Sequence, residues 1–222
     1  MTPSVPSRPW TRPKHALDRV AAVVLLVVLS PLLALIAVAV RCEGAGPVIY
    51  RQVRPGLHGA PFHIVKFRSM RPDAALERLG TDGDHLRITR LGRFLRATSL
   101  DELPNLVNVA RGEMSIIGPR PLLMSYLDLY SEHQARRHEV RPGMTGLAQV
   151  NGRNESDWET RFDLDVEYVE RCSFGLDLRI LLATVRTVVT RHGVSAPGHA
   201  TMTLFRGETA PQSEHRDASL TA

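Results

Sequence analysis

Two adjacent carboxylates, Asp101 and Glu102, lie in the sequence between Arg96 and Arg120. Mg²⁺ prefers carboxylate oxygens as ligands, and guanidinium groups bind phosphate oxygens in pairs. Acidic groups beside fixed cations therefore predict a site for a metal ion and a phosphorylated substrate, with Asp101 and Glu102 as metal ligands. Adjacent side chains on a helix point about 100° apart, so we expect the two carboxylates to have different roles.

The same carboxylates also fit a purely structural motif. Ser99 precedes them at the spacing of a capping box, with Ser at the N-cap and Glu102 three positions later. Carboxylates at a helix start are stabilised by the helix dipole whether or not they take part in chemistry. From this motif alone, a helix cap remains an alternative to a catalytic pair.

Two later segments offer further candidate binding groups. The sequence Gly118–Pro121 fixes Arg120 between Pro119 and a second proline, a rigid turn that suits a guanidinium aimed at a phosphate. The glycine-punctuated segment from Arg141 to Arg153 could line a polar pocket, to which Arg153 would contribute a cation. We therefore predict that Pro119, Arg120 and Arg153 contact substrate, although bland turns with exposed arginines have the same composition.

Elements that would position these groups are visible on the N-terminal side. Val48–Arg54 and Pro61–Arg68 are rich in β-formers, and the glycine- and proline-containing segment between them is typical of a hairpin loop. The two-residue period of a strand places Lys66 and Arg68 on one face, where they could bind substrate. The alternative for this face is a solvated basic edge.

A membrane segment is predicted from Val20 to Val40, which contains no charged residue. Its length of roughly 20 apolar residues is enough to cross a bilayer as one helix. Ser30 and Pro31 interrupt the run and suit a bent helix, and basic residues flank both ends, which favours a segment that enters and leaves on the cytoplasmic side. A kinked spanning helix and a re-entrant helix both remain open from the residues alone.

The rest of the chain predicts a small, mainly helical domain of the α+β class that carries the hairpin. Apolar residues recur at helical spacing in four segments, of which the first and last are amphipathic and basic enough to lie at a membrane interface. These segments are 87–96, 122–138, 158–170 and 177–190. We predict a flexible leader at 1–13, a membrane helix at 14–41, a catalytic domain at 42–193 and a disordered tail at 194–222.

Bulk composition narrows the class of partner without choosing one. The 222 residues are 43% hydrophobic, which suits one globular domain. A formal net charge of +5 and a pI near 9.8 favour anionic partners such as nucleotides, phospholipids or nucleic acid. Cys42 and Cys172 have no metal-binding spacing and indicate neither a zinc site nor a disulfide framework.

Taken in their order along the chain, the motifs resemble those of the bacterial sugar transferases, the small monotopic phosphoglycosyl transferases. The resemblance covers roughly Lys14 to Arg191. Its motifs are Ser30–Pro31, Lys66–Met70, Ser99–Asn105, Gly118–Pro121 and Arg141–Gly146. Two departures, His15 in place of an arginine and Leu147 in place of a tryptophan, leave the lipid head-group contact and the pocket shape near those residues open.

The resemblance implies a re-entrant helix bent at Ser30 and Pro31, and a catalytic domain on the cytoplasmic face of the inner membrane. It implies transfer of a sugar 1-phosphate from a UDP-sugar to membrane polyprenyl (undecaprenyl) phosphate, with Mg²⁺ and release of UMP. This would be the first membrane step of polysaccharide or glycoconjugate assembly. Asp101 would be the nucleophile that forms a covalent phosphosugar intermediate, Glu102 would assist it, and Arg96 and Arg120 would steady phosphate oxygens.

A protein of a different class would also account for the charge and the membrane segment: a non-catalytic membrane-anchored basic protein that binds anionic lipid or nucleic acid. It would leave the acidic pair among arginines unexplained. The sequence has no nucleic-acid-binding motif, so we expect no nucleic acid partner. The sequence leaves the sugar, the glycan pathway and a homodimer open.

Overall fold

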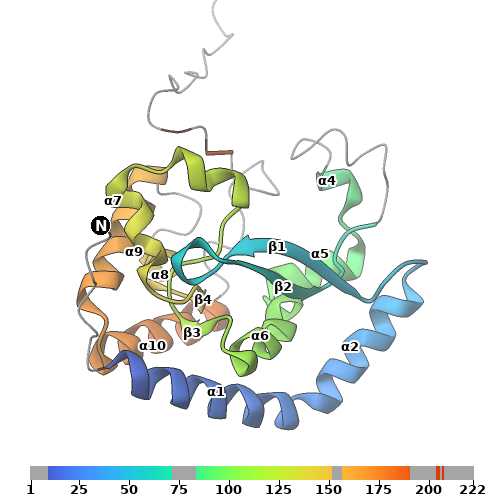
Figure 1. The fold of residues 1–222 in the computed structure, drawn as a ribbon. Helices are drawn as coiled ribbons and strands as arrows, with labels where there is room; N and C mark the ends of the chain where they lie inside the picture. The colour runs from blue at the N-terminus through green and yellow to red at the C-terminus, as the bar shows by residue number, and fades with distance from the viewer. Residues whose placement is uncertain (1–9, 72–83, 152–156, 191–203, 206, 208–222) are drawn as a thin grey trace, which may run out of the picture.

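A computed structural model describes residues 10–71, 84–151, 157–190, 204, 205 and 207 of the chain. It confirms the α+β class: helices predominate, and the described residues form two small sheets of two strands each. Figure 1 shows α1 and α2 along the lower edge of the molecule, with the β1–β2 hairpin above them, and α9 and α10 at the left, where α10 lies next to α1. The predicted leader at 1–9, the predicted tail apart from residues 204, 205 and 207, and Arg153 lie outside the described residues.

The predicted membrane segment consists of two helices, α1 (Thr11–Val28) and α2 (Ser30–Cys42), which meet at a bend of 64°. Pro31 lies in the first turn of α2, where its missing N–H costs little. The Ser30 hydroxyl donates to the Val27 carbonyl at 2.7 Å, which satisfies a group freed by the break. Neither described helix is long and apolar enough to cross a bilayer alone, whereas the bent pair together meets that length and composition. Helix α1 begins before the predicted start at Lys14, so the end of the predicted leader is helical.

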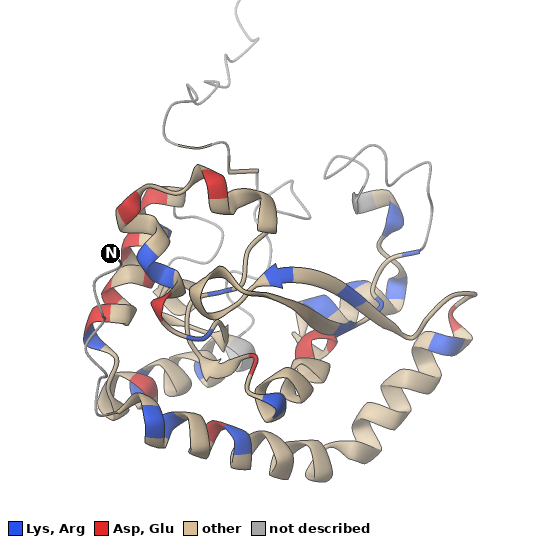
Figure 2. Ribbon diagram, viewed as in Figure 1, with Lys and Arg blue, Asp and Glu red and all other residues tan. Residues whose placement is uncertain are grey.

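Two charged residues of α1 face the protein. Lys14 and Asp18 are buried, and the Lys14 ammonium lies 3.0 Å from a carboxylate oxygen of Asp177 in α10 (Phe174–Thr190). Trp10 donates to the same oxygen at 2.9 Å, and the Ser115 hydroxyl donates to Asp18. Large apolar side chains on the remaining surface of α1 and α2 are exposed, and Figure 2 shows few charges along α2 before its end. The exposed ones are Leu17, Val20, Val23, Val24, Leu25, Val27, Val28, Leu32, Leu35 and Val38.

The predicted hairpin is confirmed. Strands β1 (Ile49–Pro55) and β2 (Pro61–Phe67) pair antiparallel, and the short 3-10 helix η1 (Leu57–Gly59) forms the connection. Their inner face places Phe62 and Ile64 in a core with α1 and with helix α6 (Leu106–Arg111). The register pairs Arg54 with Phe62 and Tyr50 with Lys66, and residues directly opposite each other point to the same face.

After the hairpin come α4 (Asp84–Arg87), α5 (Arg90–Ala97) and the 3-10 helix η3 (Leu100–Asn105). The capping-box prediction at Ser99 is wrong. Ser99 has a left-handed backbone, with φ of 57°, and its side chain makes no cap hydrogen bond. The true N-cap nearby is Thr89, whose hydroxyl accepts from the Gly92 amide at 2.8 Å at the start of α5.

The remaining elements form a second region of the same domain. A single helix over 122–138 is a wrong prediction: the segment is divided among η4, α7 and η5, because Tyr130 is extended and Ser131 starts a new helix with its own capping box. The helices predicted at 158–170 and 177–190 are confirmed as α9 and α10. Phe205, in the predicted tail, is buried against Tyr126 and Phe162. The bounds are β3 Ser115–Ile117, η4 Met124–Leu129, α7 Glu132–Ala135, η5 Arg136–Glu139, β4 Gly143–Thr145, α8 Leu147–Asn151 and α9 Trp158–Arg171.

Candidate active site

Glu102 is held between two cations that come from distant parts of the chain. One of its oxygens lies 2.7 Å from the Lys66 ammonium and 2.6 Å from an Arg120 nitrogen, and its second oxygen accepts from Arg120 at 3.3 Å. Burial alone would raise the pKa of Glu102, but Arg120 and Lys66 together hold that pKa well below its usual range. Glu102 is therefore a fixed anion that orients two cations.

Asp101 has the opposite environment. Only 9% of its surface is exposed, yet its carboxylate makes no hydrogen bond or ion pair within the described residues. Burial, and then the charge of Glu102, raise the pKa of Asp101, while Lys66, Arg96 and Arg120 lower it in part. A buried carboxyl group that makes no hydrogen bond or ion pair with any described residue is available for chemistry, and such perturbed groups are enriched at functional sites.

Two buried amide side chains bring strand β2 to the carboxylates. The Asn105 oxygen accepts from the Val65 amide at 3.2 Å, and the Asn108 side chain donates to the His63 carbonyl at 2.7 Å. Both asparagines are almost fully buried, at 1% and 0% exposure. They dock η3 and α6 on the strand, so that Lys66 meets Glu102.

Arg120 is held through the backbone on either side of it. The Gly118 amide donates to the Thr145 carbonyl and the Gly143 amide donates to the Pro119 carbonyl, both at 2.9 Å. A Cβ on Gly118 would clash with the Arg141 carbonyl, so this close approach of two backbones requires glycine.

A buried arginine also holds the turn that carries Arg120. Arg137 donates to the Arg120 carbonyl at 2.8 Å and pairs with Asp165 at 2.5 Å. Its guanidinium also lies over the rings of Tyr130 and Phe162. The turn that aims Arg120 is therefore fixed by the domain core.

A cavity of about 70 Å³ opens beside this arrangement. Among the described residues that line it, the cations outnumber the acids, since Arg54, Lys66 and Arg120 face the single carboxylate of Glu102. The excess positive charge suits an anion such as a phosphate group. Its other lining residues are Ile64, Asn105, Met114, Pro121, Leu122, Gly143 and Met144.

Sequence reasoning missed Arg54 as a site residue. The signal was present, because a hairpin register that places Arg54 opposite Phe62 also places it on the face of Lys66. The asparagines and Arg137 were missed as well. A lone buried amide or guanidinium has no sequence signature.

The structure brings some of the predicted binding residues together and not others. Lys66 and Arg120 meet at Glu102, and Arg96 is close enough to Asp101 to lower its pKa. Arg68 points elsewhere: its guanidinium donates to the carbonyls of Val40, Gly44 and Ala45 at 2.8–2.9 Å, where it satisfies the end of α2. These bonds give Arg68 a structural role, because those carbonyls lack helical partners, and its contact with substrate stays a prediction.

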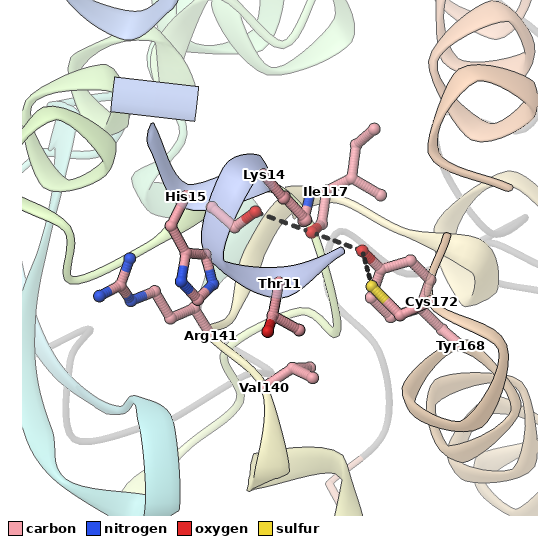
Figure 3. A pocket seen from close by; sticks show the side chains of 9 residues that line it. Thr11, Lys14, His15, Ile117, Val140, Arg141, Tyr168 and Cys172 are labelled. Carbon is pink, nitrogen blue, oxygen red and sulfur yellow. Dashed lines mark hydrogen bonds between the residues drawn. The ribbon is translucent and has the colours of Figure 1, made fainter. Parts of the chain in front are cut away.

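A second, smaller cavity lies between α1 and α9 and has a volume of about 10 Å³, room for little more than a water molecule. Figure 3 shows its lining, in which the His15 ring lies beside Arg141. Burial and then Arg141 lower the pKa of His15 to about 4, so His15 is neutral at physiological pH. Lys14 lines the same cavity and pairs with Asp177. This cavity is too small for a substrate.

Within the described residues, no three or more His, Cys, Asp or Glu side chains lie close enough to form a metal cluster. Mg²⁺ commonly takes only one or two protein carboxylates and receives its other ligands from substrate phosphates and water. Asp101 fits that pattern, because its oxygens make no bond to any residue that the structure describes. Glu102 fits less well, because both of its oxygens already accept from cations.

Comparison with known proteins gives consistent matches. The family model for bacterial sugar transferases matches residues 10–191, a range that includes every residue lining the larger cavity. The Bacillus subtilis sugar transferase EpsL is 49% identical over 194 residues, which cover 87% of this chain and 96% of the relative. A Caulobacter vibrioides protein named UDP-glucose:undecaprenyl-phosphate glucose-1-phosphate transferase is 45% identical over 190 residues, or 80% of this chain and 70% of the relative. The Salmonella typhimurium undecaprenyl-phosphate galactose phosphotransferase is 39% identical over 196 residues, or 81% of this chain and 41% of the relative.

Proposed function

Because this chain belongs to the bacterial sugar transferase family, we propose that it transfers a sugar 1-phosphate from a UDP-sugar to undecaprenyl phosphate and releases UMP. Relatives named for this reaction with glucose or galactose support the proposal. The observation that carries it is the contrast at the acidic pair. Glu102 is fixed by two cations, whereas Asp101 is buried, makes no bond to the described part of the chain and adjoins a residue of the cationic cavity.

In the first step, an oxygen of Asp101 attacks the β-phosphorus of the UDP-sugar. The bond from that phosphorus to the bridging oxygen breaks, and UMP leaves with the electron pair. A carboxylate nucleophile gives an acyl phosphate, which is itself a good phosphoryl donor. Arg120 and Lys66, which Glu102 holds in place, are positioned to steady the phosphate oxygens as charge moves to the leaving group.

In the second step, an oxygen of undecaprenyl phosphate attacks the same phosphorus. The acyl phosphate bond breaks, the Asp101 carboxylate is regenerated and the lipid diphosphate sugar is released. Glu102 would assist by orienting the incoming phosphate through the same two cations. Mg²⁺ bound with the diphosphate would neutralise its charge, and Asp101 is the protein carboxylate with oxygens free to contribute, with Glu102 the second candidate.

The proposed acceptor is a membrane lipid, so the proposal also says which parts of the protein contact the membrane. The bent pair α1 and α2 would enter the cytoplasmic leaflet and return at Ser30 and Pro31, which leaves the catalytic domain on the cytoplasmic face of the inner membrane. The exposed apolar side chains of α10, which include Phe174, Leu178, Leu182 and Val185, suit contact with lipid. Family membership favours this enzyme over the non-catalytic membrane-anchored protein.

The test is an assay of UMP release by the full chain with Mg²⁺, undecaprenyl phosphate and a panel of UDP-sugars. We expect one or a few donors to give UMP together with a lipid-linked sugar. Asp101→Asn should abolish release, while Asp128→Asn, which changes an exposed aspartate on η4, should not. No UMP from any donor, or undiminished turnover by Asp101→Asn, would overturn the proposal.

A further inference from the structure

We propose that Arg54 is the residue that binds the phosphate of the departing nucleotide. This inference rests on the proposed function, since it assigns a part of that reaction to a cation that makes no ion pair within the described residues. It adds to Lys66 and Arg120 a third cation, with a role limited to one half of the reaction.

The first argument is the bonding of the three cations that line the cavity. Lys66 and Arg120 are both paired with Glu102. Arg54 makes no ion pair within the described residues, and its side-chain bond there runs from one terminal nitrogen to the Gln52 oxygen at 2.5 Å. Its Nε is buried and has no hydrogen-bond partner among the described residues. A guanidinium has further N–H donors in a fork that matches phosphate oxygens.

The second argument is the electrostatic cost of this arrangement in the protein without ligand. Burial and then the charge of Arg120 lower the pKa of Arg54, and Tyr50, Tyr126 and Glu102 offset this only in part. A buried donor without a partner is itself unfavourable. Unfavourable local features of this kind are retained at functional sites, where a ligand relieves them. A phosphate group in the cavity would supply both the missing acceptor and the missing negative charge.

The third argument is the order of the groups. The charges that shift the pKa of Asp101 are those of Glu102, Lys66, Arg96 and Arg120. The pKa of Arg54 is shifted by the charges of Arg120 and Glu102. Arg54 lines the cavity, and Asp101 does not. Glu102, Lys66 and Arg120 line the cavity together with Arg54, so an attack by Asp101, which is not among the lining residues, comes from outside the cavity. In a phosphoryl transfer the attacking and leaving oxygens lie roughly in line on opposite sides of the phosphorus. If Asp101 attacks a phosphorus held by Lys66 and Arg120, the leaving phosphate emerges on the side of Arg54.

The experiment compares Arg54→Gln with Arg51→Gln in the full chain. Arg51 lies on the same strand, is exposed and points to the other face, so it controls for the loss of one positive charge. The first measurement is the affinity for UMP, with no sugar and no lipid. We expect Arg54→Gln to weaken UMP binding about 10- to 100-fold, the range for losing hydrogen bonds between charged groups, and Arg51→Gln to leave it unchanged.

A second measurement separates the two halves of the reaction. Wild-type enzyme and the Arg54→Gln variant are each loaded with sugar phosphate. Each is then mixed with UMP, which regenerates UDP-sugar, or with undecaprenyl phosphate, which gives the lipid-linked product. Arg54→Gln should slow discharge to UMP and leave discharge to lipid unchanged. Equal slowing of both, or an unchanged affinity for UMP, would overturn the assignment.

The variants also separate this claim from the proposed function. UMP affinity does not depend on a covalent intermediate, so failure to load the enzyme would contradict the function while the binding result still decides on Arg54. Because burial and the nearby Arg120 make the charge of Arg54 unfavourable without a ligand, Arg54→Gln should melt no lower than wild type. Arg54→Lys, which keeps the charge and loses the fork, should also bind UMP several-fold more weakly, and wild-type affinity in that variant would contradict a forked contact.

Discussion

At the scale of single residues, Asp101 and Glu102 divide what looks in the sequence like one acidic pair. Glu102 has both oxygens bonded to cations, and Asp101 has neither bonded within the described residues. Glu102 therefore sets the geometry of the site, and Asp101 retains the freedom that a nucleophile needs. Opposite effects on the protein's stability are therefore expected when each is neutralised.

Asp101→Asn should stabilise the protein while it removes activity. The raised pKa of Asp101 means that the folded state favours its neutral form, so the ionised form costs stability as the pH rises through that pKa. We expect the melting temperature at pH 7 to rise by about 2–4 °C, the shift for about 1 kcal/mol in a chain of this size, and the difference to shrink at acid pH. Thermal melts at both pH values check this, and a lower melting temperature for Asp101→Asn at pH 7 would contradict it.

The same pKa predicts the pH dependence of the rate. Asp101 must be ionised to attack phosphorus, so the rate of the first step should fall as the pH drops through its raised pKa. A profile of UMP release in the absence of lipid measures this step. An acid limb at or below the pH at which an ordinary aspartate titrates would count against Asp101 as the nucleophile.

Glu102→Gln should destabilise the protein, because it leaves Lys66 and Arg120 without their shared anion. We expect a loss of about 1–3 kcal/mol in the free energy of unfolding. Since the pKa of Glu102 is depressed, this contribution is present above the ordinary glutamate pKa and is lost only as the pH falls toward the folded value. Urea denaturation at pH 7 and at pH 5 should show similar losses, and a loss confined to pH 7 would be unexpected.

Much of the candidate site could be predicted from the sequence, and there is a physical reason for each contact that could not. Asp101, Glu102, Lys66 and Arg120 were identified because charged groups near turns and strand faces carry local signals. The structural contacts of Arg68 could not be predicted, because the two-residue period gives its face but not the carbonyls at the end of α2 that it meets. Asn105 was missed because its role depends on a strand that lies far away in the sequence.

At the scale of elements, local patterns gave the hairpin and the two C-terminal helices but not the breaks around them. The capping box at Ser99 failed because Glu102 bonds to distant cations, which local spacing cannot reveal. The helix predicted at 122–138 failed because apolar periodicity does not register the extended residue at Tyr130. The parallel pair β3 and β4 depends on contacts between distant segments, so short strands gave no signal.

The close approach of those two strands predicts a sharp difference between two glycines. Gly118→Ala should destabilise the protein and reduce activity, because the new methyl group would clash with the Arg141 carbonyl and displace the turn that holds Arg120. We expect a loss of about 1–3 kcal/mol, as for overpacking. The control is Gly175→Ala in α10, where no atom lies near the added Cβ and helix propensity should add about 0.5–1 kcal/mol. Equal effects of the two changes in denaturant unfolding would refute this account of the turn.

At the scale of the whole molecule, the N-terminal helix α1 buries charged side chains against the domain, while α1 and α2 expose apolar side chains on their outer surface. The buried Lys14–Asp177 pair fixes α1 against α10, and the bend between α1 and α2 turns the chain back toward the hairpin. Ser30 and Pro31 predicted such a bend, although the bend angle and the buried partner of Lys14 depend on the tertiary structure.

A re-entrant pair predicts that both ends of the apolar run face the cytoplasm. A cysteine-containing tag inserted just before Lys14 should resist membrane-impermeant thiol reagents in intact cells and react after lysis. A tag following the catalytic domain serves as the control and should behave identically. Labelling of the N-terminal tag from outside would mean that the helix pair crosses the bilayer.

The central claim is that Asp101 carries the sugar phosphate, and the mass of the intact protein tests it most directly. Full-length wild-type protein is incubated with Mg²⁺ and its UDP-sugar in the absence of lipid acceptor. The account predicts a mass increase of one sugar phosphate that disappears when undecaprenyl phosphate is added and never forms on Asp101→Asn. A wild-type enzyme that makes the lipid-linked sugar without this adduct, or an adduct that persists in Asp101→Asn, would contradict it.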